Sequence, residues 1–592
     1  MLLYSLLHLF GYGDLKKEDL MQFRQWGSLT PGHPEYRHTV GVEATTGPLG
    51  AGMGMAVGMA MAEAHLAAVF NKENYPVVDH YTYVLGGDGC MMEGISSEAF
   101  SLAGTLGLSK LIVLYDSNRI SIEGSTDIAF RENVQERMQA FGFQTITVED
   151  GNDIDAIGKA IEAAKADTEH PSFITIKTQI GFGCPAKQGK ASAHGEPLGV
   201  ENVEALRKNL NWPSEEPFFV PEEVYKNYSE IAEQKAEVEA AWNVMFAAYC
   251  EEYPEMEALW NQYHNAKAGE ALKDDAGFWA KQEKPEASRA ISGRLINYIK
   301  DVLPNLFGGS ADLAPSNKTN MKDAGDFSKE DRAGRNLHFG VRELAMAAIG
   351  NGIMLHGGLR AYVSTFFVFS DYCKPMARLS ALMGVPLTYV FTHDSIGVGE
   401  DGPTHEPIEQ MAALRAMPNF HVFRPCDATE TEAAWYSAVT SEHTPTALVL
   451  TRQNLEPMAG SSREALKGGY IIDDCEGTPE LILIASGSEV ALAVHAKETL
   501  AAEGQKVRVV SMPCMDLFEE QSEEYKESVL PREVRRRVAV EALGSFGWDK
   551  YTGLDGKIIA MESFGASAPA GLLFKKFGFT VEHVVEVAKS LK

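Results

Sequence analysis

Apolar and polar positions divide the 592-residue chain into regions of different periodicity. Between residue 40 and about residue 210, short runs of β-branched and aromatic residues alternate with glycine-punctuated helical patterns. The runs 81–85 (YTYVL) and 111–115 (LIVLY) are two of the predicted strands. Strands that alternate with helices form βαβ units, so this region predicts a parallel sheet flanked by helices.

A different pattern covers residues 217–286. Charged residues, Ala and Trp recur there at helical spacing, and strand signals are few. This stretch predicts helices that bridge two domains.

Two more α/β regions follow the helical stretch. Residues 287–455 contain strand candidates at 361–364, 387–392 and 447–451. From about residue 470, an apolar run, a helical pattern and a second apolar run follow one another. Polar segments separate these regions, which indicates domain boundaries.

The fold class predicted from these patterns is α/β, with three domains whose mostly parallel sheets are flanked by helices. The predicted limits are 1–250 for the first domain, 251–286 for a helical linker, 287–455 for the second domain and 456–592 for the third.

The composition is that of a folded soluble protein, with 45% hydrophobic and 23% charged residues. Lys and Arg number 53 against 82 Asp and Glu, which gives a net charge of −29. Such a charge repels phosphate backbones and anionic lipid, so binding to nucleic acid or to a membrane surface is disfavoured. A phosphorylated ligand would need a local cluster of basic side chains or backbone N–H groups.

Seven cysteines are scattered along the chain without a CxxC pair. This spacing disfavours both a disulfide framework and a structural zinc site, and it favours reduced thiols. The apolar N-terminal stretch lacks the basic start and the small-residue cleavage site of a signal peptide. We therefore expect a cytoplasmic protein.

Candidate metal ligands follow two of the predicted strands. Asp88 lies in a Gly-Asp-Gly turn directly after the strand 81–85, and Asn118 follows the strand 111–115. If these strands are adjacent and parallel, both side chains lie at the same edge of the sheet. Their oxygen atoms suit Mg²⁺ or Ca²⁺ shared with a diphosphate, although a tight turn alone explains many such Gly-Asp-Gly runs.

Further motifs occur in a fixed order along the chain. They are 30–35 (TPGHPE), 47–50 (GPLG), 86–94 (GGDGCMMEG), 180–185 (IGFGCP), 194–199 (HGEPLG), 308–317 (GGSADLAPSN), 338–343 (HFGVRE), 364–369 (STFFVF), 392–407 (THDSIGVGEDGPTHEP) and 451–455 (TRQNL). Together they resemble the thiamine diphosphate-dependent enzymes, and more narrowly the transketolase family. The resemblance implies two domains of the thiamine diphosphate-binding fold, for the diphosphate and the pyrimidine, and a C-terminal α/β domain.

The resemblance also implies the cofactor and its ligands. Thiamine diphosphate would bind with Mg²⁺, Ca²⁺ or Mn²⁺, and the cation would be held by Asp88, Asn118 and the carbonyl of Ile120. The remaining groups on the diphosphate side would be the backbone of Gly47, Pro48, Leu49 and Gly89, and the side chain of His194. We discount a dinucleotide fingerprint at 47–54 because the glycine spacing is imperfect.

The pyrimidine side of the cofactor has its own candidates. Glu343 begins an apolar helical pattern, where a paired helix-start Glu is the ordinary interpretation. The resemblance instead makes it the catalytic partner of the aminopyrimidine, a role that suits a carboxyl of raised pKa in a dry site. Phe366, Phe369 and Tyr372 have the spacing of one helical face in a core, and by resemblance they pack around the pyrimidine. Asp312 would lie near the thiazolium.

The substrate ligands are implied by the same resemblance. We expect Arg289, Ser316, His393 and Arg452 each to lie at a strand end or in a loop of the second α/β region. By resemblance they would form the basic cluster that holds the terminal phosphate of a sugar phosphate. The groups that would contact the rest of the sugar are His33, His194, Asp401 and His405. His405 and His194 are the catalytic candidates among them, and His405 or a neighbouring His is the candidate base. A lone His is usually structural, so only the surrounding motifs support these assignments.

The implied activity is that of a transferase of the pentose phosphate pathway. It would reversibly move a two-carbon ketol unit, glycolaldehyde, from a ketose phosphate such as xylulose 5-phosphate to ribose 5-phosphate or erythrose 4-phosphate. The family acts as a homodimer, in which Glu343 would reach the cofactor across the interface. Two alternatives are a related ketol transferase, such as a dihydroxyacetone synthase, and a non-catalytic remnant that still dimerises.

Chains of the family normally begin about seventy residues earlier, and that segment carries two further histidines. We therefore expect the apolar residues at the start of this chain to lie on an exposed surface. They are Leu2, Leu3, Leu6, Leu7 and Leu9.

Overall fold

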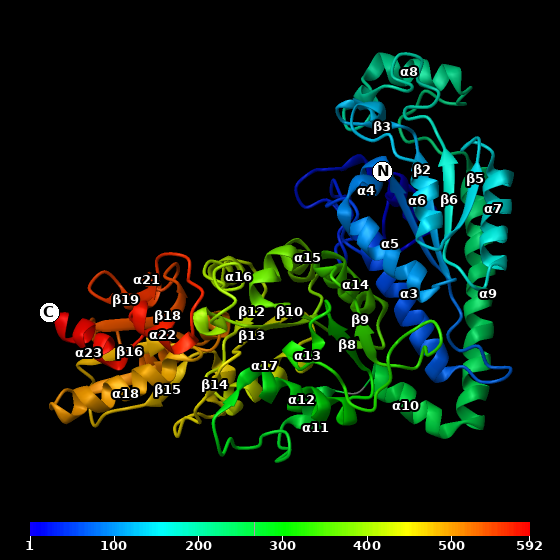
Figure 1. Cartoon of the computed structure of the whole chain (residues 1–592). Helices are drawn as coiled ribbons and strands as arrows, with labels where there is room; N and C mark the ends of the chain where they lie inside the picture. Colours follow the sequence, from blue (N-terminus) through cyan, green and yellow to red (C-terminus); the bar gives the residue numbers. More distant parts are fainter. Residues whose placement is uncertain (266, 592) are drawn as a thin grey trace. The chain divides into compact units, whose positions relative to one another are not determined.

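The computed structural model describes residues 1–265 and 267–591. The predicted limits 251–286 and 456–592 thus include residues 266 and 592, which lie outside the described residues. Two compact units can be described one by one. The first contains Met1–Asn261, Phe327–Gly334 and Asn351–Gly357, and the second contains Gln262–Asp326, Arg335–Gly350 and Gly358–Lys592 (Figure 1).

A four-stranded parallel sheet forms the centre of the first unit, with the strand order β1-β2-β6-β5. Its strands are β1 (Thr82–Gly87), β2 (Leu111–Ser117), β5 (Gln144–Val148) and β6 (Ser172–Lys177). The strands predicted at 81–85 and 111–115 are therefore confirmed, and the pairing of Gly87 with Asp116 brings their carboxyl ends to one edge. The helices packed on this sheet are α3 (Ala51–Phe70), α5 (Gly94–Leu106), α6 (Val134–Ala140) and α7 (Ile154–Ala166).

Helix α3 is long and apolar enough to cross a membrane by length and composition, with a mean hydropathy of 1.4. However, 72% of its apolar window is buried inside the structure, as in the core helix of a folded domain. Its two buried polar side chains, Glu63 and His65, also contact other residues of the unit. Lys110 Nζ lies 2.6 Å from a carboxylate oxygen of Glu63, and His65 Nδ1 lies 2.9 Å from the carbonyl oxygen of Arg332.

The stretch predicted as helical contains α9 (Glu222–Glu252), α10 (Pro254–His264) and α11 (Ala268–Leu272). Most of helix α9 is exposed or half-buried, and within this helix only Tyr249 is buried. Two aromatic side chains bind α9 to the rest of the first unit. Tyr249 donates to the carbonyl of Phe70 at 2.7 Å, and Trp242 Nε1 donates to the carbonyl of Val77 at 3.0 Å.

The second unit contains two larger sheets. The first is six-stranded and fully parallel, in the order β12-β13-β11-β10-β8-β9. Its strands are β8 (Leu306–Ser310), β9 (Asn336–His338), β10 (Arg360–Phe366), β11 (Thr388–Thr392), β12 (His421–Phe423) and β13 (Thr446–Leu450). Its principal helices are α12 (Ser288–Val302), α13 (Ala314–Asn317), α14 (Glu343–His356), α15 (Ser370–Met383), α16 (Gln410–Arg415) and α17 (Ala428–Thr440).

The C-terminal sheet is five-stranded, in the order β15-β17-β16-β18-β19, and only its edge strand β15 is antiparallel. The strands are β15 (Tyr470–Asp473), β16 (Leu481–Ala485), β17 (Val507–Ser511), β18 (Arg537–Gly544) and β19 (Lys557–Met561). Helices α18 (Glu489–Ala502) and α23 (Val581–Ser590) pack beside each other on this domain. The α/β class with mostly parallel sheets is thus confirmed.

The N-terminal helix α1 (Leu2–Leu9) corrects one expectation. Leu2 and Leu3 are exposed, at 69% and 39%, but Leu7 is buried in a small cluster with Tyr4 and Val42. Leu6 and Leu9 are half-buried. The expectation of exposure is therefore wrong for Leu7, because this segment makes a local core with the residues that follow it.

Candidate active site

Asp88 begins the short helix α4 (Asp88–Met92) immediately after β1 and is only 4% exposed. Its carboxylate is held from two sides: the hydroxyl of Tyr115 donates to Oδ1 at 2.6 Å, and the backbone N–H of Arg119 donates to Oδ2 at 2.9 Å. Burial and the hydrogen bond to Asp88 raise the pKa of Tyr115, so the phenol keeps the proton that it donates. The carboxylate is therefore fixed in orientation.

The turn after β2 supplies the other candidate metal ligands. Asn118 Oδ1 accepts the backbone N–H of Ile120 at 3.0 Å, and Arg119 between them adopts a left-handed φ of 60°. Because the amide of Arg119 binds Asp88 directly, the structure brings Asp88 and the Asn118–Ile120 turn together at the edge of the sheet. This donor set has one carboxylate, one amide and one carbonyl, all of them hard oxygen ligands.

The loop 47–50 lies against the turn that contains Asp88 and Gly89. A Cβ built on Gly89 would lie 2.8 Å from Leu49 Cδ1, so the side chain of Leu49 contacts this glycine and would have to move to admit another side chain. Gly47 has a φ of 124°, and a Cβ there would be 4.0 Å from the ring of His33. The structure thus places His33, the loop 47–50 and Gly89 next to one another.

A cavity of about 310 Å³ opens beside Asp88. Its lining includes Tyr115, Arg119, Arg131 and Glu132, and both arginines make hydrogen bonds to Asp127. His194 does not line this cavity; it follows the 3₁₀ turn 191–193 and is exposed. Of the candidates on the diphosphate side, His194 is the one that the described contacts do not join to Asp88.

Three adjacent strands of the six-stranded sheet deliver the phosphate candidates to one edge. Phe366 pairs with Thr392, and Thr392 pairs with Leu450, so the ends of β10, β11 and β13 are level. His393 and Arg452 follow directly in the two loops after β11 and β13. These loop positions match the sequence prediction.

Arg289 and Ser316 lie in helices, which corrects the prediction that all four phosphate candidates lie at strand ends or in loops. Arg289 is in the first turn of α12, and Ser316 is in α13. Nη1 of Arg289 donates to the carbonyl of Ser316 at 2.9 Å and lies 3.4 Å from His393 Nε2. The helices thus bring both residues to His393.

The two arginines are held close by their neighbours in sequence. Thr451 N–H donates to Ser288 Oγ at 2.8 Å, and Ser288 N–H donates to Thr451 Oγ1 at 3.1 Å. Because these bonds are reciprocal, Arg289 and Arg452 emerge beside each other from different segments. Burial lowers the pKa of Arg289, and the like charge of Arg452 lowers it further.

His393 is 3% exposed, and its hydrogen bonds define its tautomer. Arg289 has no acceptor, so His393 Nε2 accepts and Nδ1 carries the proton. Nδ1–H then donates to Thr392 Oγ1 at 2.8 Å, and that hydroxyl donates to Asn317 Oδ1 at 2.7 Å. Burial, Arg289, Arg452 and His405 lower the pKa of His393 to about 3, so this imidazole is neutral at physiological pH.

The aromatic candidates correct a second prediction. Phe366 ends β10, Phe369 ends a 3₁₀ turn and Tyr372 lies in α15, so they do not share one helix face. Their rings are nevertheless adjacent, with centroids 6.1 Å apart in both successive pairs. Tyr372 is 62% exposed, which also excludes the ordinary core interpretation for this residue.

His405 belongs to the same group. Its ring lies 5.5 Å from that of Phe369 and 6.4 Å from that of Phe366, while Phe366 itself lies 3.8 Å from the ring of His393. The structure therefore brings the base candidate, the aromatic candidates and the phosphate candidates into one cluster.

Two pyrimidine-side candidates are less enclosed. Glu343 is the first residue of α14 and is half-buried, so its surroundings are not dry in the single chain. Asp312 is exposed and has a φ of 60°, which residues other than glycine rarely adopt. Asp401 is exposed in the loop before His405.

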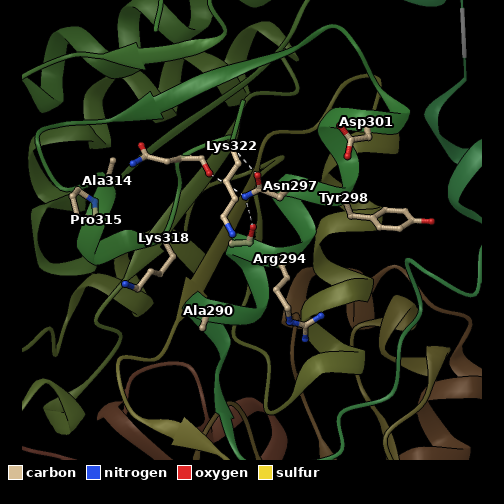
Figure 2. A pocket seen from close by; sticks show the side chains of 11 residues that line it. Ala290, Arg294, Asn297, Tyr298, Asp301, Ala314, Pro315, Lys318 and Lys322 are labelled. Carbon is tan, nitrogen blue, oxygen red and sulfur yellow. Dashed lines mark hydrogen bonds between the residues drawn. The ribbon is translucent and has the colours of Figure 1, made fainter. Parts of the chain in front are cut away.

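A separate cavity of about 740 Å³ adjoins the phosphate cluster without including it (Figure 2). Its lining includes Ala290 and Pro315, which neighbour Arg289 and Ser316 in sequence, and the side chains of Arg294, Lys318 and Lys322. The candidate site is therefore a cluster at a strand edge rather than this open cavity.

Comparisons with known proteins agree with this arrangement. Three family models match: the thiamine diphosphate binding domain of transketolase at residues 1–268, its pyrimidine binding domain at 284–458, and the transketolase-like C-terminal domain at 468–580. The chain is 54% identical over 597 residues to a transketolase of Halalkalibacterium halodurans, with 100% of this chain and 89% of that protein covered. The chain belongs to the transketolase family.

Solved transketolases support the same assignment. The enzyme from Leishmania mexicana superposes with a TM-score of 0.95 at 47% identity, covering 100% of this chain and 88% of that chain. A Pichia stipitis transketolase in complex with sedoheptulose 7-phosphate gives a TM-score of 0.94 at 46% identity, with 100% and 87% covered. The three domains, the thiamine diphosphate-binding fold and the transferase class predicted from the sequence are therefore confirmed, whereas the exact domain limits stay predictions.

Within this transketolase, sequence reasoning missed Glu406, the neighbour of His405. It is 2% exposed, and no well-aligned hydrogen bond reaches either carboxylate oxygen. Gly565 is packed against it, since a Cβ there would lie 1.8 Å from Glu406 Oε2. Burial and the charge of Asp401 raise the pKa of Glu406 to about 7, while the amide of Ala566 opposes the rise.

We predict that Glu406→Gln changes the pH dependence of stability. Between pH 4.5 and about 7 the folded chain keeps a proton that the unfolded chain has released, so this group destabilises the fold as pH rises. Glutamine cannot ionise, so the variant's Tm relative to the parent should be higher at pH 8 than at pH 5, by at least about 2 °C. The exposed Glu409→Gln is the control, and an equal Tm difference at both pH values would contradict the prediction.

Proposed function

We propose that this transketolase transfers a two-carbon ketol unit reversibly from a ketose phosphate, such as xylulose 5-phosphate, to ribose 5-phosphate or erythrose 4-phosphate. The observation that carries the proposal is the match of the whole chain to a transketolase at 54% identity. The solved Pichia stipitis transketolases bind sedoheptulose 7-phosphate and fructose 6-phosphate, which supports sugar phosphates as the substrate class. We further propose that the protein is cytoplasmic and acts in the pentose phosphate pathway.

The residues around Asp88 fit a divalent cation that joins a diphosphate to the protein. Asp88 is fixed by Tyr115 and by the Arg119 amide, and the Asn118–Ile120 turn lies beside it. One carboxylate among neutral oxygens leaves the cation enough positive charge to neutralise the diphosphate. Among the described residues no cluster of three or more His, Cys, Asp and Glu side chains offers a competing metal site. We propose Mg²⁺, with Ca²⁺ or Mn²⁺ as substitutes.

When bound, thiamine diphosphate supplies the electron sink that ketose cleavage requires and that the twenty side chains lack. Glu343 would hold and return a proton at the pyrimidine nitrogen, and the half-buried position of its side chain leaves it accessible to a cofactor. Phe366, Phe369 and the exposed Tyr372 would enclose the pyrimidine ring. Asp312 would lie near the thiazolium.

The exposure of Tyr372 and the half-buried position of Glu343 in the single chain are the reason to propose a homodimer. A second protomer would cover both side chains and bring its own Asp88 turn to the cofactor. Glu343 would then act across the interface, and each site would contain groups from both protomers.

The phosphate cluster would hold the far end of the sugar phosphate. The hydrogen bonds between Ser288 and Thr451 hold Arg289 and Arg452 near each other, where their positive charges repel. A phosphate dianion would relieve this repulsion. The same dianion would raise the low pKa of His393, which would then donate from both ring nitrogens. Ser316 completes the cluster through its position on α13.

Other candidate residues would contact the sugar part of the substrate. His405, next to Phe366 and Phe369, is the proposed base for the C3 hydroxyl proton of the ketose. His33, Asp401 and His194 are the proposed partners of the remaining sugar oxygens and of the phosphate side of the cofactor. All three are exposed in the single chain.

Removal of the metal ligand should abolish stabilisation by the cofactor. Thiamine diphosphate with Mg²⁺ should raise the Tm of the parent, because ligand at 100 times its Kd adds about 2.7 kcal/mol. Asp88→Asn keeps both local contacts, since its Oδ1 can accept the Arg119 amide and its Nδ2 can donate to Tyr115, but it removes the negative charge. We expect this variant to show no shift.

Asp153→Asn is the matched control, because Asp153 accepts the Ala156 amide at the start of α7 and Asn caps a helix equally well. A parent without any Tm shift would overturn the proposed cofactor site. A full shift in Asp88→Asn would overturn Asp88 as a ligand.

The phosphate cluster predicts the kinetics of Arg452→Ala. In a coupled assay, KM for xylulose 5-phosphate and ribose 5-phosphate should rise about tenfold or more, the loss of one charged hydrogen bond. Unphosphorylated xylulose and ribose should be affected little. Arg294→Ala, which changes an arginine of the same domain outside the cluster, is the control. An equal KM increase for both kinds of sugar would contradict the assignment.

A further inference from the structure

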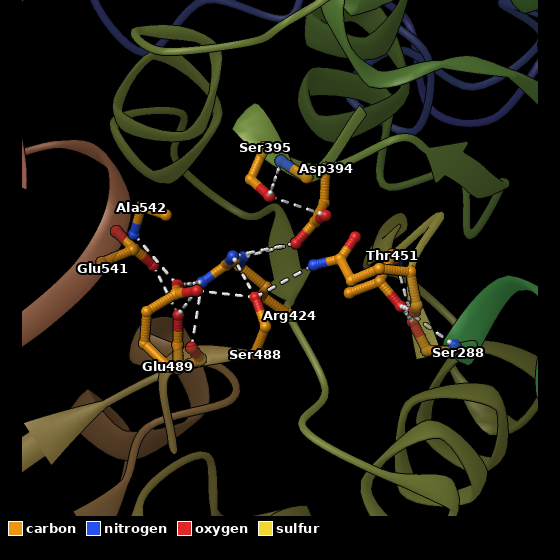
Figure 3. Close-up of polar contacts among 12 residues, drawn as sticks. Ser288, Asp394, Ser395, Arg424, Thr451, Ser488, Glu489, Glu541 and Ala542 are labelled. Atoms are coloured by element: carbon orange, nitrogen blue, oxygen red, sulfur yellow. Dashed lines mark hydrogen bonds and ion pairs between the residues drawn. The ribbon is translucent and has the colours of Figure 1, made fainter. Parts of the chain in front are cut away.

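A buried ionic cluster contains Asp394, the residue directly after the phosphate candidate His393 (Figure 3). At its centre is Arg424, which follows β12 and is 0% exposed, as are Asp394 and Glu489. Arg424 binds Asp394 Oδ2 through Nε and Nη2, both at 2.9 Å, and binds Glu489 Oε2 through Nη1 at 2.5 Å. None of these three side chains belongs to the proposed cofactor or substrate ligands.

The cluster joins two domains within the second unit. Asp394 and Arg424 lie in the pyrimidine-binding match at 284–458, whereas Ser486, Ser488 and Glu489 lie in the C-terminal match at 468–580. The carbonyl of Ser486 accepts Arg424 Nη1 at 2.9 Å, and Gly487 N–H donates to the carbonyl of Arg424 at 3.0 Å. The loop 486–489 is thus fastened to Arg424 by side chain and backbone together.

Other groups of the C-terminal domain also bind the carboxylate of Glu489. Ala542 N–H donates to Glu489 Oε2 at 2.9 Å, and Ser488 Oγ donates to Oε1 at 2.6 Å. Gln453, which follows Arg452, donates to Ser488 Oγ at 3.4 Å. The loop therefore contacts the segment that carries Arg452 directly, and it reaches the segment that carries His393 through Arg424.

Asp394 is the residue directly after His393, and His393 is strained. Its φ of 64° is rarely adopted by a residue with a side chain. On one side the strand β11 fixes Thr392, and on the other side Arg424 fixes Asp394. A strained conformation persists only where its surroundings determine it, and these two anchors do so.

We propose that Asp394 and Arg424 are positioning residues that hold His393 in its left-handed conformation facing Arg289, and that the C-terminal domain sets their geometry through Glu489. This proposal rests on the proposed phosphate site. It gives the C-terminal domain a part in substrate recognition although its residues do not enter that site.

The energetics of buried ion pairs agree with a positioning role. Removing two charges from water is expensive, and apolar replacements of such pairs are often equally stable. Three buried carboxylates, those of Asp394, Glu489 and Glu541, surround Arg424 and its neighbour Arg415, with Glu541 bound by Arg415 at 2.8 Å through both oxygens. Stability alone does not require this arrangement, whereas a fixed loop geometry does.

Asp394→Asn tests the proposal, because asparagine can still accept from Arg424 but carries no charge. We expect kcat/KM for xylulose 5-phosphate to fall by at least about tenfold, chiefly through KM, since displacement of a binding group by about 1 Å has effects of that size or larger. The values for unphosphorylated xylulose should not change. A merely structural residue would lower Tm and leave this preference for the phosphate intact.

Asp474→Asn is the matched control, because Asp474 forms a two-point Arg–Asp pair within the C-terminal domain, with Arg508 at 2.9 Å, and its described hydrogen bonds do not involve His393 or Arg424. It should lower Tm without changing the phosphate preference. If Asp394→Asn does not fold, Glu489→Gln is measured instead, and a selective rise in KM for the phosphorylated sugar is expected from it as well.

The outcomes separate this proposal from the proposed function. A parent enzyme that does not prefer phosphorylated sugars would contradict the phosphate site itself. If the parent prefers them and Arg452→Ala removes the preference, an unchanged preference in the Asp394 or Glu489 variant overturns only the positioning role. Equal losses for phosphorylated and unphosphorylated sugars would overturn it too.

Discussion

Parallel strand pairing is the constraint on which the candidate site depends, because it brings the carboxyl ends of neighbouring strands to one edge. In the first unit, the pairing of Gly87 with Asp116 carries Asp88 to the turn that contains Asn118. In the second unit, level ends of β10, β11 and β13 carry Phe366, His393 and the segment of Arg452 together. The same rule therefore builds both the proposed site for the diphosphate end of a cofactor and the proposed site for a sugar phosphate.

Electrostatics explains how an acidic chain of net charge −29 could bind a phosphate at the proposed cluster. The phosphate cluster concentrates Arg289 and Arg452 around a neutral imidazole, at the expense of mutual repulsion that a bound dianion would relieve. Behind it, the carboxylates of Asp394 and Glu489 neutralise Arg424 in a buried layer. Positive charge is thus available to the ligand on one side and is fully compensated on the other.

The sequence predicted the parts of this picture that local patterns encode. Strand, Gly-Asp-Gly turn, helix and strand are contiguous, so Asp88 and Asn118 could be placed before the structure was known. The helical face expected for Phe366, Phe369 and Tyr372 was wrong, because β10 ends at Phe366 and the backbone changes from strand to 3₁₀ turn to helix within seven residues. Arg424 and Glu406 were missed because their partners come from distant segments, which no local spacing reveals.

A crystal of the protein grown with thiamine diphosphate and Mn²⁺ would test the central claim, because the anomalous signal of Mn²⁺ locates the cation directly. We predict one strong peak at the β1–β2 edge, within coordination distance of a carboxylate oxygen of Asp88, Oδ1 of Asn118 and the carbonyl oxygen of Ile120. A cofactor-bound crystal whose manganese peak lies elsewhere, with Asp88 still bound only to Tyr115 and the Arg119 amide, would contradict the account.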